Sequence, residues 1–211
     1  MQMIIIILGV LCLVFFIENA RELRTFRIRT YRIFSHKLKG IQKKRIVFLS
    51  DLHNCSYGKN NGRLLAAVRR SRPDLILIGG DMLVRKNGTS YAKTLKFLTR
   101  LTAMCPVYYA NGNHEQKLKE EPERYEQSYA AYKKHLEEAG IIFLENEAVI
   151  WKTGRARIRI SGLEIPLSAY GKLGKKKLNV RQIEDRIGGS DPSYQILLAH
   201  NPAYVRQYEA W

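Results

Sequence analysis

Cysteine and acidic residues are both scarce in this 211-residue sequence. The three cysteines, Cys12, Cys55 and Cys105, are too few and too scattered for a disulfide framework or a Cys-x-x-Cys zinc site. There are no internal repeats, and an apolar fraction of 45% with 26% charged residues excludes global disorder, collagen and coiled coil. The length suits one domain with an appendage. With 36 basic and 19 acidic residues the net charge is +17, which points to nucleic acid, a phosphate-bearing substrate or an anionic membrane surface as partner.

The N-terminal residues 1–17 carry no charged side chain, whereas residues 18–45 carry ten Lys or Arg and two Glu, a net +8. An apolar run followed by a basic flank is typical of a transmembrane helix and its juxtamembrane segment. A cleavable signal peptide would have basic residues before the run and small residues after it, and neither is present. We therefore predict a single-pass anchor at 1–18 and a basic linker at 19–44. The positive-inside rule places the following domain on the cytoplasmic face of the cell membrane.

Two alternatives for this region are weaker. A buried N-terminal helix of a soluble protein would show polar positions at a period of 3.6 residues, which the run lacks. Nucleic acid is not expected as the partner of the basic flank, because it would leave the adjacent apolar run unexplained.

Beyond residue 45, short apolar runs alternate with amphipathic stretches, which indicates an α/β domain over 45–211. The expected strands are 45–50, 75–78, 106–110, 141–144, 148–152, 157–163 and 195–199, the pair 148–152 and 157–163 being antiparallel. The expected helices are 61–72, 91–101, 123–139, 180–187 and 202–211.

Polar residues follow four of the buried strands. They are Asp51 and His53, then Asp81 after two glycines, then the run 111–115, and finally His200. If the first strand persists, Asp51 and His53 project to the same side and offer an oxygen and a nitrogen to one cation. Each residue alone has a structural explanation, as a helix cap, a turn residue or a core histidine. Together, on strands that a parallel topology aligns, they predict one site at the carboxyl ends.

The set Asp51-x-His53, Gly80-Asp81, Gly112-Asn113-His114-Glu115 and His200 resembles the successive motifs of the calcineurin-like metallophosphoesterases. The resemblance covers about 45–211 and implies a four-layer α-β-β-α sandwich. With the N-terminal anchor, the chain looks most similar to the membrane-associated bacterial phosphodiesterases of that family. The implied activity is hydrolysis of a phosphate ester, including a lipid-linked one, by attack of a metal-bridging hydroxide.

The resemblance also implies a role for each residue of the site. Asp51 and His53 would bind the first of two divalent metal ions, Asp81 would bridge both, and Asn113 and His200 would bind the second. His114 would protonate the leaving oxygen or stabilise the phosphoryl charge. Mixed nitrogen and oxygen ligands favour Mn, Fe or Zn over Mg or Ca.

A few further residues keep open interpretations. Cys55 is either a thiolate ligand or, more in keeping with its isolation, a small residue under a loop. Lys59, Arg85 and Lys86 either contact substrate phosphate or are solvated loop charges.

The family's further Gly-His-x-His motif is missing, because residues 201–211 contain no histidine. His36 and His135 lie in the basic linker and on a helix, so neither replaces it. We therefore expect a C-terminally truncated domain that binds the second metal poorly and has little turnover. The alternatives are a non-catalytic membrane-surface protein with a degenerate fold, and a nuclease, which would not need the anchor.

Overall fold

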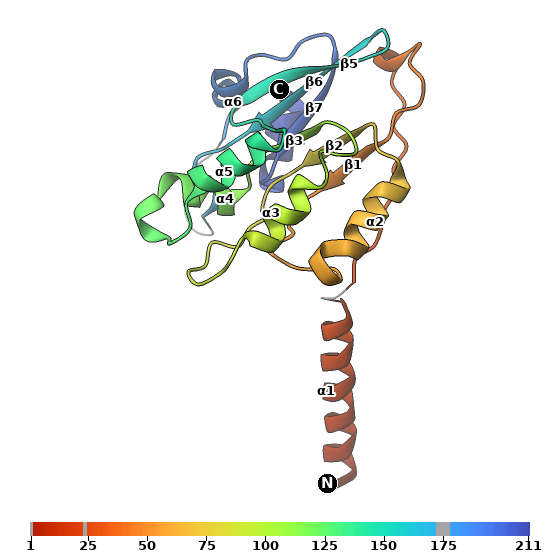
Figure 1. Cartoon of the computed structure of the whole chain (residues 1–211), viewed down its shortest axis with the longest axis vertical. Coiled ribbons are helices and arrows are strands. Elements are labelled where there is room, and N and C mark those ends of the chain that lie inside the picture. The colour runs from red at the N-terminus through yellow and green to blue at the C-terminus, as the bar shows by residue number, and fades with distance from the viewer. Residues whose placement is uncertain (1, 23–24, 172–177) are drawn as a thin grey trace.

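The computed structural model describes residues 2–22, 25–171 and 178–211. Residues 23 and 24 of the predicted linker lie outside this range. The first element, α1 (Gln2–Glu22), extends away from the rest of the chain (Figure 1). Its residues Gln2–Asn19 have a mean hydropathy of 2.3 and none of this window is buried. By length and composition α1 is therefore able to cross a membrane, while the boundaries 1–18, 19–44 and 45–211 stay a prediction.

The first sheet is parallel, with the strand order β1 (Ile46–Leu49), β2 (Leu75–Ile78), β3 (Val107–Tyr109) and β4 (Ile141–Phe143). All four residues of β2 are buried, because both faces of this sheet are covered. Ile76 and Ile78 pack against the helix layer. That layer consists of α2 (Gly62–Ser71), α3 (Ala92–Thr99) and α5 (Tyr129–Glu138).

The second sheet pairs β5 (Glu147–Thr153) antiparallel to β6 (Ala156–Leu163), and β6 parallel to β7 (Tyr194–Ala199). Leu75 and Leu77 of the first sheet share a core with Ile158 and Ile160 of the second. A third cluster joins the end of β6 to α6 (Val180–Ile187) and the C-terminal segment. The layers are therefore helices, sheet, sheet and helix, which confirms the predicted α-β-β-α sandwich (Figure 1).

One expectation about elements was wrong. The helix expected at 123–139 is divided into a 3-10 turn at Pro122–Arg124 and α5, and a further helix, α4 (Asn113–Glu120), precedes them. The polar run at 111–115, which we expect directly after the third strand, leads into this helix, which begins at Asn113. The helix expected at 202–211 begins as a 3-10 turn, Pro202–Tyr204, and continues as α7 (Val205–Ala210).

Candidate metal centre

The loop after β1 carries Asp51 and His53 in an unusual backbone conformation. β1 ends at Leu49, so the two residues do not project from a persisting strand, and that part of the prediction was wrong. Both have positive φ, 56° and 48°, which costs energy for side chains other than glycine. Their amides donate to the carbonyls of Gly80 and Asp81, each at 3.0 Å. This turn brings His53 Nε2 within 3.5 Å of Asp51 Oδ1.

Asp81 lies between two glycines that permit close approach of the chain. A Cβ on Gly80 would lie 2.1 Å from the amide nitrogen of Gly112, and a Cβ on Gly112 would lie 2.2 Å from Asp81 Oδ1. The amide of His114 donates to the same Oδ1 at 2.8 Å. The Asp81 side chain is 4% exposed, and only Oδ2 remains for the other side chains of the cluster. The glycines therefore fix a single buried carboxylate at the centre of the site.

His200 arrives from the second sheet, directly after β7. We expect His200 to follow a strand of the same parallel sheet as the other site residues. The structure shows that its strand belongs to the second sheet, although His200 still lies beside Asp51 and Asp81. Its Nε2 lies 3.2 Å from Asp81 Oδ2, and its Nδ1 lies 2.8 Å from the Gly79 carbonyl. Burial lowers the pKa of His200, but the pairing with Asp81 outweighs it and raises that pKa to about 9. The same pairing keeps the pKa of Asp81 below its usual value, although burial opposes this.

The carbonyl of Gly79 and the amide of Arg85 set two histidines in opposite tautomers. A carbonyl only accepts, so His200 Nδ1 carries a proton and the lone pair of Nε2 faces Asp81 when the ring is neutral. Conversely, the amide of Arg85 donates to His114 Nδ1 at 3.1 Å. A neutral His114 therefore carries its proton on Nε2, which lies 3.9 Å from Asp81 Oδ2.

The pKa of His114 is lowered, so that its ring is uncharged at neutral pH. Burial lowers the pKa of His114, the charge of Asp81 opposes this, and the nearby Arg85 guanidinium adds to the lowering. A neutral ring that faces the cluster with an N–H suits hydrogen-bond or proton donation rather than metal ligation.

Two groups of potential ligand atoms converge, each within 4.8 Å. One is His53, Asp81 and His114, and the other is Asp51, Asp81 and His200. Asp81 is common to both, which fits the predicted bridging carboxylate, and the mixture of imidazole nitrogen and carboxylate oxygen suits divalent transition metals. The division of ligands between the two ions stays a prediction.

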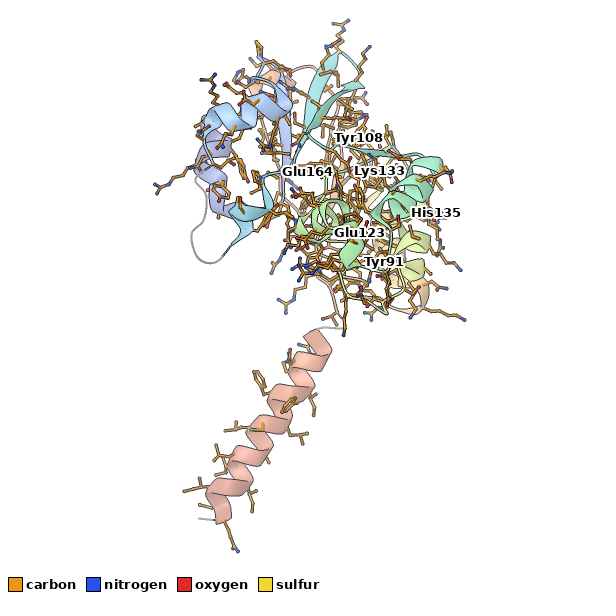
Figure 2. All side chains as sticks on the ribbon, turned by 90° about the vertical axis from the view of Figure 1, so that its left-hand side faces the viewer. Tyr91, Tyr108, Glu123, Lys133, His135 and Glu164 are labelled. Carbon is orange, nitrogen blue, oxygen red and sulfur yellow. The ribbon has the colours of Figure 1, made fainter. Side chains whose placement is uncertain are left out.

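The remaining predicted residues are placed less directly. Asn113 is the first residue of α4 and is half-buried beside His114, and its role as a ligand stays a prediction. Cys55 is exposed and belongs to neither group among the described residues. His135 is exposed on α5 and points away from the domain, as expected (Figure 2).

Glu115 is a residue to which the sequence assigned no role. It is fully buried and accepts hydrogen bonds from the amides of Asp81, Leu83 and Gly112 at 2.8, 3.1 and 3.1 Å, and from the hydroxyl of Tyr109 at 3.0 Å. Burial raises the pKa of Glu115, and the nearby Asp81 charge adds to this. It therefore ties the turn after β2 to the turn after β3. Its place in the run 112–115 was visible in the sequence, but its hydrogen-bond partners were not.

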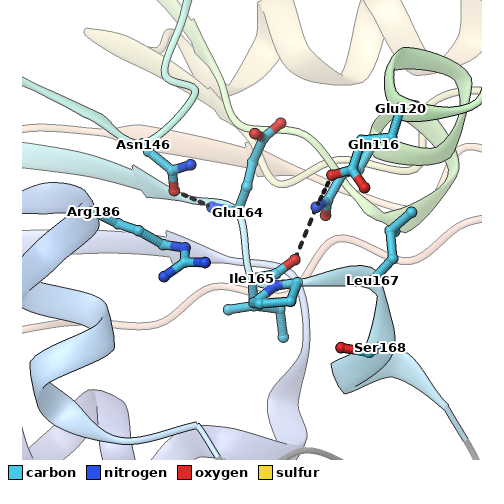
Figure 3. A pocket seen from close by; sticks show the side chains of 9 residues that line it. Gln116, Glu120, Asn146, Glu164, Ile165, Leu167, Ser168 and Arg186 are labelled. Atoms are coloured by element: carbon cyan, nitrogen blue, oxygen red, sulfur yellow. Dashed lines mark hydrogen bonds between the residues drawn. The ribbon is translucent and has the colours of Figure 1, made fainter.

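A polar cavity of about 460 Å³ is lined by residues of α4, of α6 and of the segment that follows β6 (Figure 3). Gln116, buried in its wall, donates to the Ile165 carbonyl at 2.9 Å, and the amide of Glu164 donates to Asn146 at 2.9 Å. The first bond joins α4 to the segment that follows β6, and the second joins that segment to the residue before β5. We assign the cavity no ligand.

The fold and the ligand cluster define a hydrolase of the metal-dependent phosphoric ester type, and the comparisons with known proteins agree. Residues 44–211 match the model of the calcineurin-like phosphoesterase family. The chain therefore belongs to this family.

Individual relatives are more distant. The chain is 28% identical over 205 residues to a protein of Bacillus subtilis (strain 168) described as an uncharacterized metallophosphoesterase, YkoQ, covering 96% of this chain and 70% of that one. Among solved structures, the phosphopantetheinyl hydrolase PptH of Mycobacterium tuberculosis is similar with a TM-score of 0.49 and 16% identity, over 79% of this chain and 71% of that one. The Aquifex aeolicus protein AQ665, described as a protein of unknown function, is similar with a TM-score of 0.28 and 17% identity, over 59% of this chain and 64% of that one.

Proposed function

We propose that this protein is a dinuclear metal-dependent phosphoesterase or phosphodiesterase that acts at the cell membrane, on phosphate esters that include lipid-linked ones. The observation that carries the proposal is the opposite tautomers of His200 and His114 beside Asp81. Once a cation displaces the Nε2 proton of His200, that imidazole offers it a lone pair, and the His114 imidazole offers a proton to an oxygen. A metal-assisted phosphoester hydrolysis needs both.

Asp51, His53, Asp81, Asn113 and His200 are the residues that would hold the two ions, of Mn, Fe or Zn. When bound, a pair of such ions orients the phosphate, neutralises its charge and supplies a nucleophile at neutral pH. His200 is suited to this because the Gly79 carbonyl fixes its ring, as partners of metal-ligating histidines generally do.

His114 would act on the leaving group. A ligand at Nε2 would require a proton on Nδ1, but Nδ1 already accepts from the Arg85 amide. The ring therefore donates its Nε2 proton to the oxygen of the departing alcohol. General acid catalysis of this kind contributes about 10²–10⁴-fold to a rate.

Arg85 would contact the phosphate. Among the described residues its Nη1 is buried without a hydrogen-bond partner, and its charge is close enough to lower the pKa of His114. A guanidinium recognises phosphate oxygens with paired N–H groups. Lys59 and Lys86 are exposed, in keeping with solvated loop charges.

Placement at the membrane rests on α1 and on the basic flank that follows it. α1 supplies an apolar segment of spanning length, and the flank would face the anionic cytoplasmic leaflet. Resistance of the full chain to alkaline extraction from membranes supports this placement, and release into the supernatant contradicts it.

The catalytic proposal is tested by a matched pair of variants, His200→Asn and His114→Asn, in the full chain. We expect His200→Asn to lower Mn²⁺ affinity. We expect His114→Asn to retain that affinity while its hydrolysis of a chromogenic phosphodiester falls by about 10²–10⁴-fold. Calorimetric Mn²⁺ titration is the first readout because it does not depend on the choice of substrate. Equal loss of Mn²⁺ affinity in both variants contradicts the assignment of His114, and a wild-type chain that binds no metal favours the non-catalytic alternative.

A further inference from the structure

Residues 27–34, here called the strap, are exposed throughout. They form no helix or strand, and none of their backbone groups makes a hydrogen bond to another described residue. Their apolar members are among the most exposed of the chain: Ile28 is 60% exposed, Tyr31 83%, Ile33 69% and Phe34 89%. Soluble proteins rarely leave such apolar side chains together on the surface without a partner.

Both ends of the strap are attached to the domain. At its start, Phe26 packs against the core, with its ring edge-on to Tyr57 at 5.1 Å between centroids. Beyond its end, Leu38 packs against the core between the two sheets, and Lys37 Nζ donates to the Ser193 carbonyl at 3.2 Å. The strap leaves the domain end nearest α1 and runs to the opposite end (Figure 1). Its exposed middle is therefore held in place as a surface.

The charge of the strap is of one sign. Arg27, Arg29 and Arg32 alternate with the apolar residues, and no Asp or Glu occurs between residues 25 and 45. Arginine and aromatic side chains interleaved in this way suit the headgroup region of an anionic bilayer, where the cations meet phosphates and the rings enter the acyl boundary. A second copy of the strap would instead face like charges.

We propose that the strap docks flat on the anionic bilayer into which α1 inserts. α1 ends at Glu22, only a few residues before Phe26, so its exit from the membrane would keep the start of the strap beside the headgroups. The far end of the strap reaches them when the domain lies with its strap face toward the bilayer. A fully extended chain spans about 3.3 Å for each residue, and the strap would therefore contact the bilayer over at most about 25 Å. This second contact fixes the orientation of the domain, which a single helix cannot do.

Docking in this way narrows the substrate class of the site, and this step rests on the proposed function. Tyr57, which holds the start of the strap, belongs to the loop that follows β1 and carries Asp51 and His53. A docked strap therefore brings the rim of the metal centre to the membrane surface. The substrate that fits is an amphiphilic phosphate ester whose apolar part stays in the same bilayer.

The test uses the full chain with Phe34→Trp, reconstituted in phosphatidylcholine vesicles with and without phosphatidylglycerol and with brominated acyl chains. Val205→Trp is the matched control, since Val205 is also exposed but lies on α7. We expect bromine to quench the emission of Phe34→Trp in anionic vesicles, with no added quenching for Val205→Trp. Each arginine near an anionic surface contributes about a fivefold gain in binding, so changing Arg27, Arg29 and Arg32 to Gln should weaken docking by about a hundredfold and abolish the quenching.

A second readout distinguishes loss of membrane docking from loss of catalytic activity. The triple arginine variant should lose hydrolysis of a vesicle-borne phosphate ester but retain hydrolysis of a soluble chromogenic ester. Unquenched Phe34→Trp in vesicles that retain the chain after alkaline washing overturns the strap proposal and leaves the anchor intact. Concentration-dependent crosslinking at residue 34 without quenching would show a second copy as the partner and overturns it as well. A wild-type chain that hydrolyses neither ester and binds no Mn²⁺ contradicts the proposed function instead.

Discussion

Gly112→Ala tests whether the position of Asp81 governs the metal centre. The backbone of Gly112 has φ of −91°, which alanine adopts freely, so the substitution adds only a methyl group. That methyl carbon would lie 2.2 Å from Asp81 Oδ1 and 2.5 Å from the Asp81 amide nitrogen. A carbon and an oxygen normally stay about 3.3 Å apart, so the carboxylate must move by about 1 Å.

Two effects of different size follow from this displacement. Overpacking of this kind costs about 1–3 kcal/mol, and the melting temperature falls by about 2–4 °C for each kcal/mol in a chain of this size. Because Asp81 is common to both groups of potential ligand atoms, its displacement disturbs the geometry of both at the same time. We expect Mn²⁺ affinity to fall by about 10–100-fold, the range found when groups that orient metal ligands are changed.

The assay is Mn²⁺ titration by calorimetry, with thermal melting followed by circular dichroism. Gly62→Ala is the control, since Gly62 begins α2 with φ of −59° and a Cβ there would meet no atom within 4 Å. It should leave Mn²⁺ affinity unchanged and leave stability equal or slightly higher. Wild-type Mn²⁺ affinity in Gly112→Ala would refute the reasoning.

Two further predictions concern the support of the site. The side chain of buried Asn61 accepts a hydrogen bond from the Tyr57 amide at 2.7 Å, and Asn61→Ala leaves that donor unsatisfied. The substitution should therefore lower the free energy of unfolding, measured by urea titration, by about 1–3 kcal/mol. Unchanged stability contradicts this. Burial raises the pKa of Glu145, but hydrogen bonds from Lys133 and Tyr129 outweigh it and hold that pKa below 4.5. Its contribution to stability is therefore present above pH 4.5 and lost as the pH falls through the folded value. Between about pH 6 and pH 3 the wild-type protein should lose more stability than Glu145→Gln, and equal losses would contradict this.

The sequence was sufficient for the sheet elements and for most of the cluster. A strand that is buried on both faces consists of consecutive apolar residues, as residues 75–78 do. Such a run predicts a strand between two layers even when the neighbouring strands and helices are not known. Asp51, His53, Asp81 and His200 were predicted because each follows such a strand. The structure brings them, with His114, to one place.

The geometry of the site was not predictable in the same way. Asp51 and His53 adopt positive φ because their amides bond to the loop after β2, a partner that lies about thirty residues away. The tautomers of His114 and His200 depend on Arg85 and Gly79 in that same region. α4 was missed because its apolar content is low, and its burial comes from the contacts of Glu115 and Gln116. These features arise from tertiary contacts rather than from local pattern.

The central claim is that Asp81 is the shared ligand of a metal centre. Elemental analysis of the purified full chain, after loading with Mn²⁺ and dialysis, tests it most directly when wild type and Asp81→Asn are compared. We predict bound metal in the wild type, about one equivalent or more because the second ion is expected to bind poorly, and almost none in Asp81→Asn. Circular dichroism should show that both chains are folded. Equal metal content in the two folded chains, or none in the wild type, would contradict the claim.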